Sequence, residues 1–196
     1  MPTAFVGLTG GLGSGKSTAL AAFARLGAAT LSTDAVVHEL YSGDAVRDAV
    51  VERWGDEVAP EGAVDRGAVA RRAFASPEER AWLEGLIWPL VGQRVADFRT
   101  AADAAAPPPR AAVVETPLLF EAGMEALYDA TIAVVAPEEI RLARAAARGH
   151  EAVDERAKRQ LTQEEKAARA SYVVVNDGSV EALEAALADV LASLGR

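Results

Sequence analysis

The residues from Gly10 to Ser17, GGLGSGKS, have the types and spacing of a phosphate-binding loop, G-x-x-x-x-G-K-[ST]. Glycines let backbone N–H groups turn inward around phosphates, and the start of a following helix adds free donors. Lys16 would place its charge beside the β- and γ-phosphates, and the Ser17 hydroxyl would join a Mg²⁺ shell. The expected nucleotide-binding residues are Gly11, Leu12, Gly13, Ser14, Gly15, Lys16, Ser17 and Thr18.

The alternative is a flexible glycine turn with no ligand, and the elements expected on either side of the loop argue against it. Residues 4–8 form a short apolar run that is typical of a buried strand. Residues 17–26 carry apolar side chains at helical spacing and stop at Gly27. A strand that enters the glycines and a helix that leaves them are what phosphate binding by such a loop requires.

Short apolar segments alternate with helical patterns along the rest of the chain. Further strands are expected at residues 28–31, 111–114, 131–135 and 172–175. Helices are expected at 35–41, 45–54, from Pro77 toward Arg99 with a possible kink at Pro89, 137–148, 153–161 and 180–194, and 55–67 looks like a loop. This alternation predicts an α/β fold, a five-stranded parallel sheet with helices on both faces.

Polar residues follow three of these strands, where ligands bind in parallel sheets. Asp34 could take a proton from an acceptor hydroxyl or hold Mg²⁺ through water, but it could equally cap the helix that follows. Glu115 stands where many phosphate-loop proteins use an Asp for Mg²⁺, and it is one methylene longer. Asn176 follows the last strand in a turn.

Arginines gather in the second half of the chain. Arg141, Arg144 and Arg148 lie at helical spacing, and Arg156 and Arg159 follow. Arginines that close over a nucleotide neutralise the charge that develops on a transferred phosphoryl group. The alternative is a solvated helix face that pairs with neighbouring glutamates.

Composition limits the classes of partner. The chain has 196 residues, 51% of them hydrophobic, which is enough for one full core and a small subdomain. Its net charge of -9 predicts a surface that repels nucleic acid and anionic lipid. It has no cysteine, so thiolate catalysis and disulfides are excluded. No apolar run approaches the ~20 residues of a membrane span, and no signal peptide is evident, so we expect a cytoplasmic protein.

A phosphate-binding loop occurs in several classes of nucleotide-binding protein. The guanine signature N-K-x-D and the switch motif D-x-x-G are both absent from the sequence, which argues against a GTP switch. A binding protein without catalysis would leave the arginine-rich segment unexplained. A small kinase explains the donor loop, a carboxylate base, a middle segment for the acceptor and an arginine lid.

Several stretches resemble signatures of the dephospho-coenzyme A kinase family, nearly from end to end. LTGGLGSGKST at 8–18 is similar to that family's opening, and LGA at 26–28 leads to a strand and Asp34. ETPLLFE at 115–121 resembles the family's D-x-P-L-L-F-E signature, the most discriminating stretch. Further matches are VDR at 64–66 followed by Phe74, Arg144 and Arg148, Arg156 with Gln160, EEK at 164–166, and YVVVNDG at 172–178.

The resemblance implies that ATP with Mg²⁺ phosphorylates the 3′-hydroxyl of dephospho-CoA, the last step of coenzyme A synthesis. Another small-molecule or nucleoside monophosphate kinase is the alternative. The resemblance also implies a P-loop kinase fold with a core (about 1–57, 110–137 and 170–196), a helical acceptor subdomain (about 58–109) and a helical lid (about 138–169). We expect a monomer or a weak oligomer.

Roles for single residues also follow from the resemblance. Asp34 becomes the base for the ribose hydroxyl, Lys16, Arg144 and Arg148 become catalytic, and Asn176 is expected near the donor adenine. The implied acceptor contacts are Asp34, Arg66, Glu115, Pro117, Leu118, Leu119 and Glu121. The chain departs from the family pattern at Ser32, His38, Trp88 and Glu115, where an Asp, an Arg, a His and an Asp are usual.

Overall fold

The structure, a computed structural model, describes residues 2–146 and 160–195. It divides into two compact units. Met1–Ser32 and Arg99–Arg196 form what we call the sheet unit, and Thr33–Phe98 form the helical unit. Each is described by itself.

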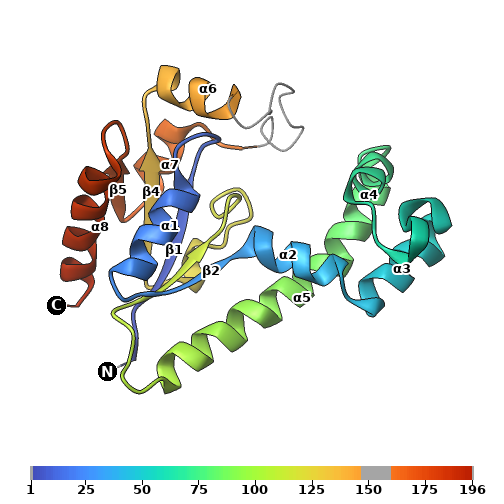
Figure 1. Ribbon diagram of the computed structural model, residues 1–196, viewed down its shortest axis with the longest axis horizontal. Helices are drawn as coiled ribbons and strands as arrows, with labels where there is room; N and C mark the ends of the chain where they lie inside the picture. The colour runs from blue at the N-terminus through green and yellow to red at the C-terminus, as the bar shows by residue number, and fades with distance from the viewer. Residues whose placement is uncertain (1, 147–159, 196) are drawn as a thin grey trace. The chain divides into compact units, whose positions relative to one another are not determined.

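The sheet unit is built on five parallel strands (Figure 1). They are β1 (Phe5–Gly10), β2 (Ala29–Ser32), β3 (Ala112–Glu115), β4 (Ala130–Val135) and β5 (Tyr172–Val175), in the order β2-β3-β1-β4-β5. Every residue of β1 is buried, as expected for the central strand of a sheet covered on both faces. The predicted five-stranded parallel sheet is therefore confirmed.

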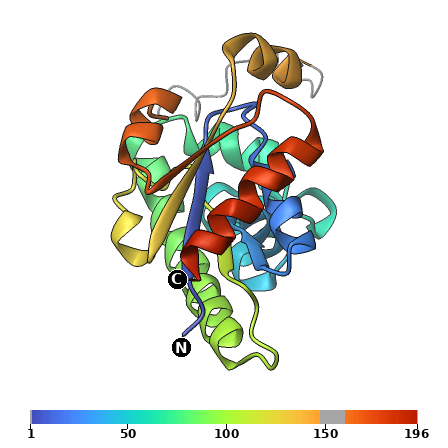
Figure 2. The ribbon, with the colours of Figure 1, turned by 90° about the vertical axis from the view of Figure 1, so that its left-hand side faces the viewer.

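One face of the sheet is covered by α1 (Lys16–Arg25) and α8 (Val180–Leu194), which contact each other. Figure 2 shows α8 in front of the strands with α1 next to it. Side chains that alternate along the strands, such as Val6 and Leu8 of β1, meet Phe23 of α1 and Leu187 of α8 in the main core. This packing fixes the first helix directly behind the glycine loop.

The opposite face of the sheet carries α7 (Gln163–Arg169), which contacts β4 and β1, and the last residues of α5 (Pro77–Ala104). Arg99 of α5 lies with its guanidinium carbon 4.8 Å from the centre of the Phe5 ring. The backbone N–H of Thr3 donates to Asp103. Helices α6 (Glu138–Ala146) and α7 flank the part of the chain that the structure does not describe.

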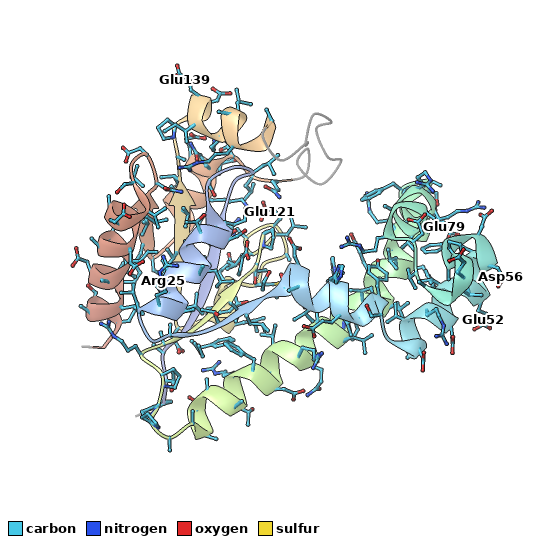
Figure 3. The ribbon with its side chains drawn as sticks, viewed as in Figure 1. Arg25, Glu52, Asp56, Glu79, Glu121 and Glu139 are labelled. Carbon is cyan, nitrogen blue, oxygen red and sulfur yellow. The ribbon has the colours of Figure 1, made fainter. Side chains whose placement is uncertain are left out.

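The helical unit holds α2 (Thr33–Tyr41), α3 (Asp44–Trp54), two short 3₁₀ turns (Asp56–Val58 and Pro60–Gly62), α4 (Arg66–Ala73) and α5 as far as Phe98. Its own small core contains Val50, Val58 and Val69. The Trp54 and Trp82 rings meet edge to face, with centroids 5.0 Å apart. Glu79, labelled in Figure 3, accepts from Trp54 Nε1 at 2.6 Å and from Arg53.

Two helices were not expected from the sequence. Helix α4 begins at the end of the segment that looked like a loop, because Asp65 Oδ1 accepts from the N–H groups of Gly67 and Ala68. Helix α7 begins with a capping box between Thr162 and Glu165. The helix from Pro77 continues through Pro89 to Ala104, and the one expected at 153–161 falls mostly outside the described residues. Among the helices that the structure describes, none is long and apolar enough to span a membrane.

Candidate active site

The glycine loop joins β1 to α1 through two left-handed residues. Gly13 has φ 75° and Gly15 has φ 95°, conformations that L side chains rarely adopt. A Cβ at Gly13 would run into the backbone of Arg141, and one at Gly15 would run into the side-chain amide of Asn176. Only glycine fits at these two positions, so the backbone can form the cradle that the sequence predicts.

Lys16 and Ser17 stand at the start of α1, where free backbone N–H groups favour an anion. Lys16 Nζ donates to the carbonyl oxygens of Gly10 and Gly11, both at 3.0 Å, which holds its charge against the loop. The Ser17 side chain is exposed. Ser14 is fully buried, and its Oγ has no hydrogen-bond partner among the described residues.

Asn176 connects the loop to the arginine helix α6. Its Nδ2 donates to the carbonyl of Ser14 at 2.8 Å, and its own N–H donates to the carbonyl of Val135 at 2.7 Å. Arg144 donates to the Asn176 carbonyl at 3.3 Å and to Oδ1 at 3.5 Å. The structure thus brings together the loop, Asn176 and Arg144, three expected nucleotide contacts from distant parts of the chain.

Helix α6 lies against the loop through Arg141. The Arg141 backbone is close to Gly13, and one of its guanidinium nitrogens is close to Gly11. Its Nε is buried and has no partner among the described residues. These contacts differ from those expected of a solvated helix face. Arg148, Arg156 and Arg159 lie outside the described residues.

The segment ETPLLFE begins at the carboxyl end of β3. Glu115 is only 6% exposed and pairs in register with Leu8 of β1 and Ser32 of β2. The N–H of Thr116 donates to the carbonyl of Leu8. After it, Pro117 and Leu118 are partly exposed, whereas Leu119 is fully buried. The loop is therefore seated beside the strand that leads into the phosphate loop.

Glu121, labelled in Figure 3 on the loop after β3, forms a buried ion pair with Lys166 of α7. Its Oε1 lies 3.0 Å from Lys166 Nζ and also accepts from the N–H of Leu161 at 2.8 Å. Burial lowers the pKa of Lys166, and the hydrogen bond and charge of Glu121 oppose that shift. No role for Lys166 was expected from the sequence, although it lies in the EEK stretch that resembles the family.

Two expected acceptor residues belong to the helical unit. Asp34 is exposed in the first turn of α2, which begins at Thr33, the residue directly after β2. It is thus inside the helix rather than the residue before it. Arg66 is exposed at the first position of α4.

The residues at the loop fit a nucleotide with its Mg²⁺. The two glycines make a cradle that any Cβ would fill, and the Ser17 hydroxyl is accessible to solvent. Mg²⁺ prefers hard oxygen ligands and keeps several waters, so one hydroxyl plus substrate phosphates is a sufficient protein contribution. Glu115 supplies a carboxylate at the neighbouring strand end.

Comparison with known proteins decides the family. A family model described as dephospho-CoA kinase matches residues 4–182. The dephospho-CoA kinase of Anaeromyxobacter dehalogenans is 40% identical over 97% of this chain and 94% of its own. That of Streptomyces avermitilis is 38% identical over 96% and 93%. The chain belongs to the dephospho-CoA kinase family.

Solved structures agree with the kinase fold. A crystal structure from Thermus thermophilus, 34% identical, covers 99% of both chains with a TM-score of 0.81. Dephospho-CoA kinase from Campylobacter jejuni, 21% identical, covers 99% of this chain and 98% of its own at a TM-score of 0.65. A shikimate kinase from Bacteroides thetaiotaomicron, 16% identical over 99% of both chains, shares the fold at 0.53. The predicted P-loop kinase fold is confirmed, and the dephospho-CoA kinase family is one of enzymes that transfer phosphoryl groups.

Proposed function

We propose that this chain phosphorylates the ribose 3′-hydroxyl of dephospho-CoA with ATP, giving CoA and ADP, the last step of coenzyme A synthesis. The observation that carries the proposal is the family match over residues 4–182. The built phosphate loop supports it, because a kinase needs a donor site of this kind. ATP and dephospho-CoA are its proposed substrates and the cytoplasm its proposed location, and we infer a monomer or a weak oligomer.

On the donor side, the loop from Gly11 to Thr18 would hold the ATP phosphates, with Ser17 as the protein ligand of Mg²⁺. Mg²⁺, when bound, neutralises charge on the phosphate oxygens. Lys16 would contact the β- and γ-phosphates as a point charge. Asn176, already bonded to Ser14, would fix the loop near the adenine, and Arg144 with Arg148 would stabilise the transferring phosphoryl group.

On the acceptor side, Asp34 would accept the proton of the 3′-hydroxyl as the phosphoryl group is transferred in line. Its exposure in the first turn of α2 supports this role, because the carboxylate is open to a ligand. Arg66 is the proposed partner of the acceptor's anionic groups. The end of β3 contributes Glu115, and the loop after it contributes Pro117, Leu118, Leu119 and Glu121, of which Pro117 and Leu118 offer the accessible surface.

The test is a competition between acceptors. Purified protein is given ATP and Mg²⁺ with dephospho-CoA, shikimate or AMP, and kcat/KM is measured from ADP release. We expect dephospho-CoA to be preferred, with CoA identified by mass. Preference for shikimate or AMP would move the assignment to another small-molecule kinase, and ATP binding without turnover of any acceptor would contradict catalysis.

A further inference from the structure

Lys166 on α7 is the most deeply buried charged side chain of the described residues, with no exposed surface. Lysine is almost never fully buried unless it is paired. Its Nζ donates to the carbonyl of Pro117 at 2.6 Å and to Thr9 Oγ1 at 3.4 Å, and it pairs with Glu121 Oε1 at 3.0 Å. An ammonium group has three N–H bonds, so these three acceptors account for all of them.

The three acceptors belong to two segments that have different proposed roles, one in binding ATP and one in binding the acceptor. Thr9 is the residue of β1 immediately before Gly10, where the phosphate loop begins. Pro117 and Glu121 belong to the loop of residues 116–122 that follows β3, and we call it the acceptor loop. Thr9 Oγ1 also donates to the Pro117 carbonyl at 3.3 Å. Lys166 therefore connects the end of β1, the strand that leads into the phosphate loop, to the acceptor loop.

Hydrogen bonds at the first turn of α7 hold the helix in place, and they thereby fix the position of Lys166. Gln163 Nε2 donates to the carbonyl of Ala136 at 2.9 Å, and the N–H of Ala136 donates to Gln163 Oε1 at 3.0 Å. Ala136 lies between β4 and the arginine helix α6. The N–H of Leu161, just before α7, donates to Glu121. Helix α7 and the residue just before it thus contact β1, the acceptor loop and the residue that leads into α6.

We propose that Lys166, paired with Glu121, is a positioning residue that sets the acceptor loop relative to the phosphate loop. This inference rests on the proposed function. With no exposed surface, Lys166 acts through Thr9 and Pro117 rather than on a substrate. Misplacing reacting groups by about 1 Å can cost about 10²-fold in rate, so a displaced loop would lower turnover more than binding.

The competing explanation is an ion pair that only stabilises the fold. Buried ion pairs can often be replaced by apolar groups of similar volume without loss of stability. Removing one partner alone would then lower stability but leave the kcat of the folded protein unchanged. The two explanations therefore differ in kcat rather than in folding.

The experiment compares Lys166→Met, which keeps an unbranched side chain that is one atom shorter and removes its charge, with Arg169→Met on the same helix. Arg169 pairs with Glu125 and lies 4.9 Å from the centre of the Phe120 ring, but it does not join the two loops. For Lys166→Met we expect kcat to fall at least about tenfold, with KM for dephospho-CoA and Kd for ATP changed by less than about threefold. Arg169→Met should keep kcat within about twofold.

A second variant keeps the inference testable if Lys166→Met does not fold. Glu121→Gln retains an acceptor for Leu161 and Lys166 but loses the charge that balances the buried ammonium, so kcat should fall by a larger factor than KM for dephospho-CoA changes. Where both fold, the double variant should be no worse than Lys166→Met, because the two residues act as one unit.

The positioning role is overturned if Lys166→Met loses no more kcat than Arg169→Met, if its loss lies wholly in KM, or if the two changes are additive. Unchanged kcat in Glu121→Gln overturns it when Lys166→Met does not fold. Wild-type turnover of dephospho-CoA is measured first. If the wild type prefers another acceptor, the same variants are compared on that acceptor, so the proposed function and the positioning role fail separately.

Discussion

The phosphate loop and the acceptor residues of the helical unit are built in opposite ways. The loop is closed by its own backbone and neighbours: Gly15 faces Asn176, Asn176 binds Ser14, and Lys16 binds two loop carbonyls. Asp34 and Arg66, by contrast, are exposed side chains on the first turns of short helices. The donor site therefore depends on backbone geometry, and the proposed acceptor site depends on individual side chains.

The largest expected effect comes from Gly15→Ala, which tests the backbone half of this comparison. The left-handed backbone costs an alanine about 1–3 kcal/mol, and its Cβ would also overlap with Asn176 Nδ2, a clash that displaces the Asn176 amide. The two costs together should exceed about 4 kcal/mol, so we expect kcat/KM for ATP to fall by about 10³-fold or more. The matched control is Gly62→Ala in the helical unit, where φ is 79° and a Cβ meets nothing within 4 Å. It should lose some stability and keep its affinity for ATP. Equal losses of activity in both variants would contradict the claim that the donor site depends on the backbone geometry of the loop.

Arg144→Ala tests the helix that contacts the loop. If Arg144 stabilises the transferring phosphoryl group, kcat should fall by a factor on the order of 10³, measured by ADP release at saturating substrates. The control is Arg25→Ala, because Arg25, labelled in Figure 3, pairs at the surface with Glu184 of α8. Full activity of Arg144→Ala would instead support the alternative that these arginines form a solvated helix face without a role in catalysis.

Asp34→Asn tests the side-chain half of the comparison. Loss of a general base should lower kcat by about 10²-fold while ATP affinity stays nearly intact, because the loop is built without this residue. Asp44→Asn, a change of the same kind in the first turn of α3, should have no effect on kcat. Near-normal turnover of Asp34→Asn would contradict the role of general base and leave Asp34 as an acidic residue that stabilises the first turn of α2.

The smallest expected effect concerns the stability of the helical unit at acid pH. Hydrogen bonds from Arg53, and then from Trp54, hold the pKa of Glu79 below its ordinary value of 4.5. A lowered folded-state pKa contributes stability that is present above pH 4.5 and is lost as the pH falls through the folded pKa. Urea unfolding between pH 7 and pH 3 should show a smaller acid loss in Glu79→Gln than in the wild type or Glu52→Gln. Parallel curves for all three proteins would contradict this.

The parts of the molecule that the sequence predicts well are those with a local signal. The strand, glycine loop and first helix are consecutive, and their periodicity and glycine spacing appear within about two dozen residues. Helices α4 and α7 were missed because they are short and polar, and their only strong signals are the caps at Asp65 and at Thr162 with Glu165.

Contacts between distant residues had no local signal. Lys166 and Thr9 are 157 residues apart, so no spacing rule could bring them together. The same holds for Asn176 and Ser14, which are 162 residues apart. The role proposed for Arg66 came from the family resemblance, which also decided between the two alternatives that its position left open for Asp34, and neither role is tested by the geometry of its own helix.

The most direct test of the central claim follows one phosphoryl group from donor to acceptor. The wild-type enzyme is given dephospho-CoA and ATP labelled with ¹⁸O on its γ-phosphate, and the products are analysed by mass and by ³¹P NMR. The account predicts CoA whose 3′-phosphate carries the label, formed in equal amount with ADP. Label found in free phosphate, or at any position other than the 3′-hydroxyl, would contradict it.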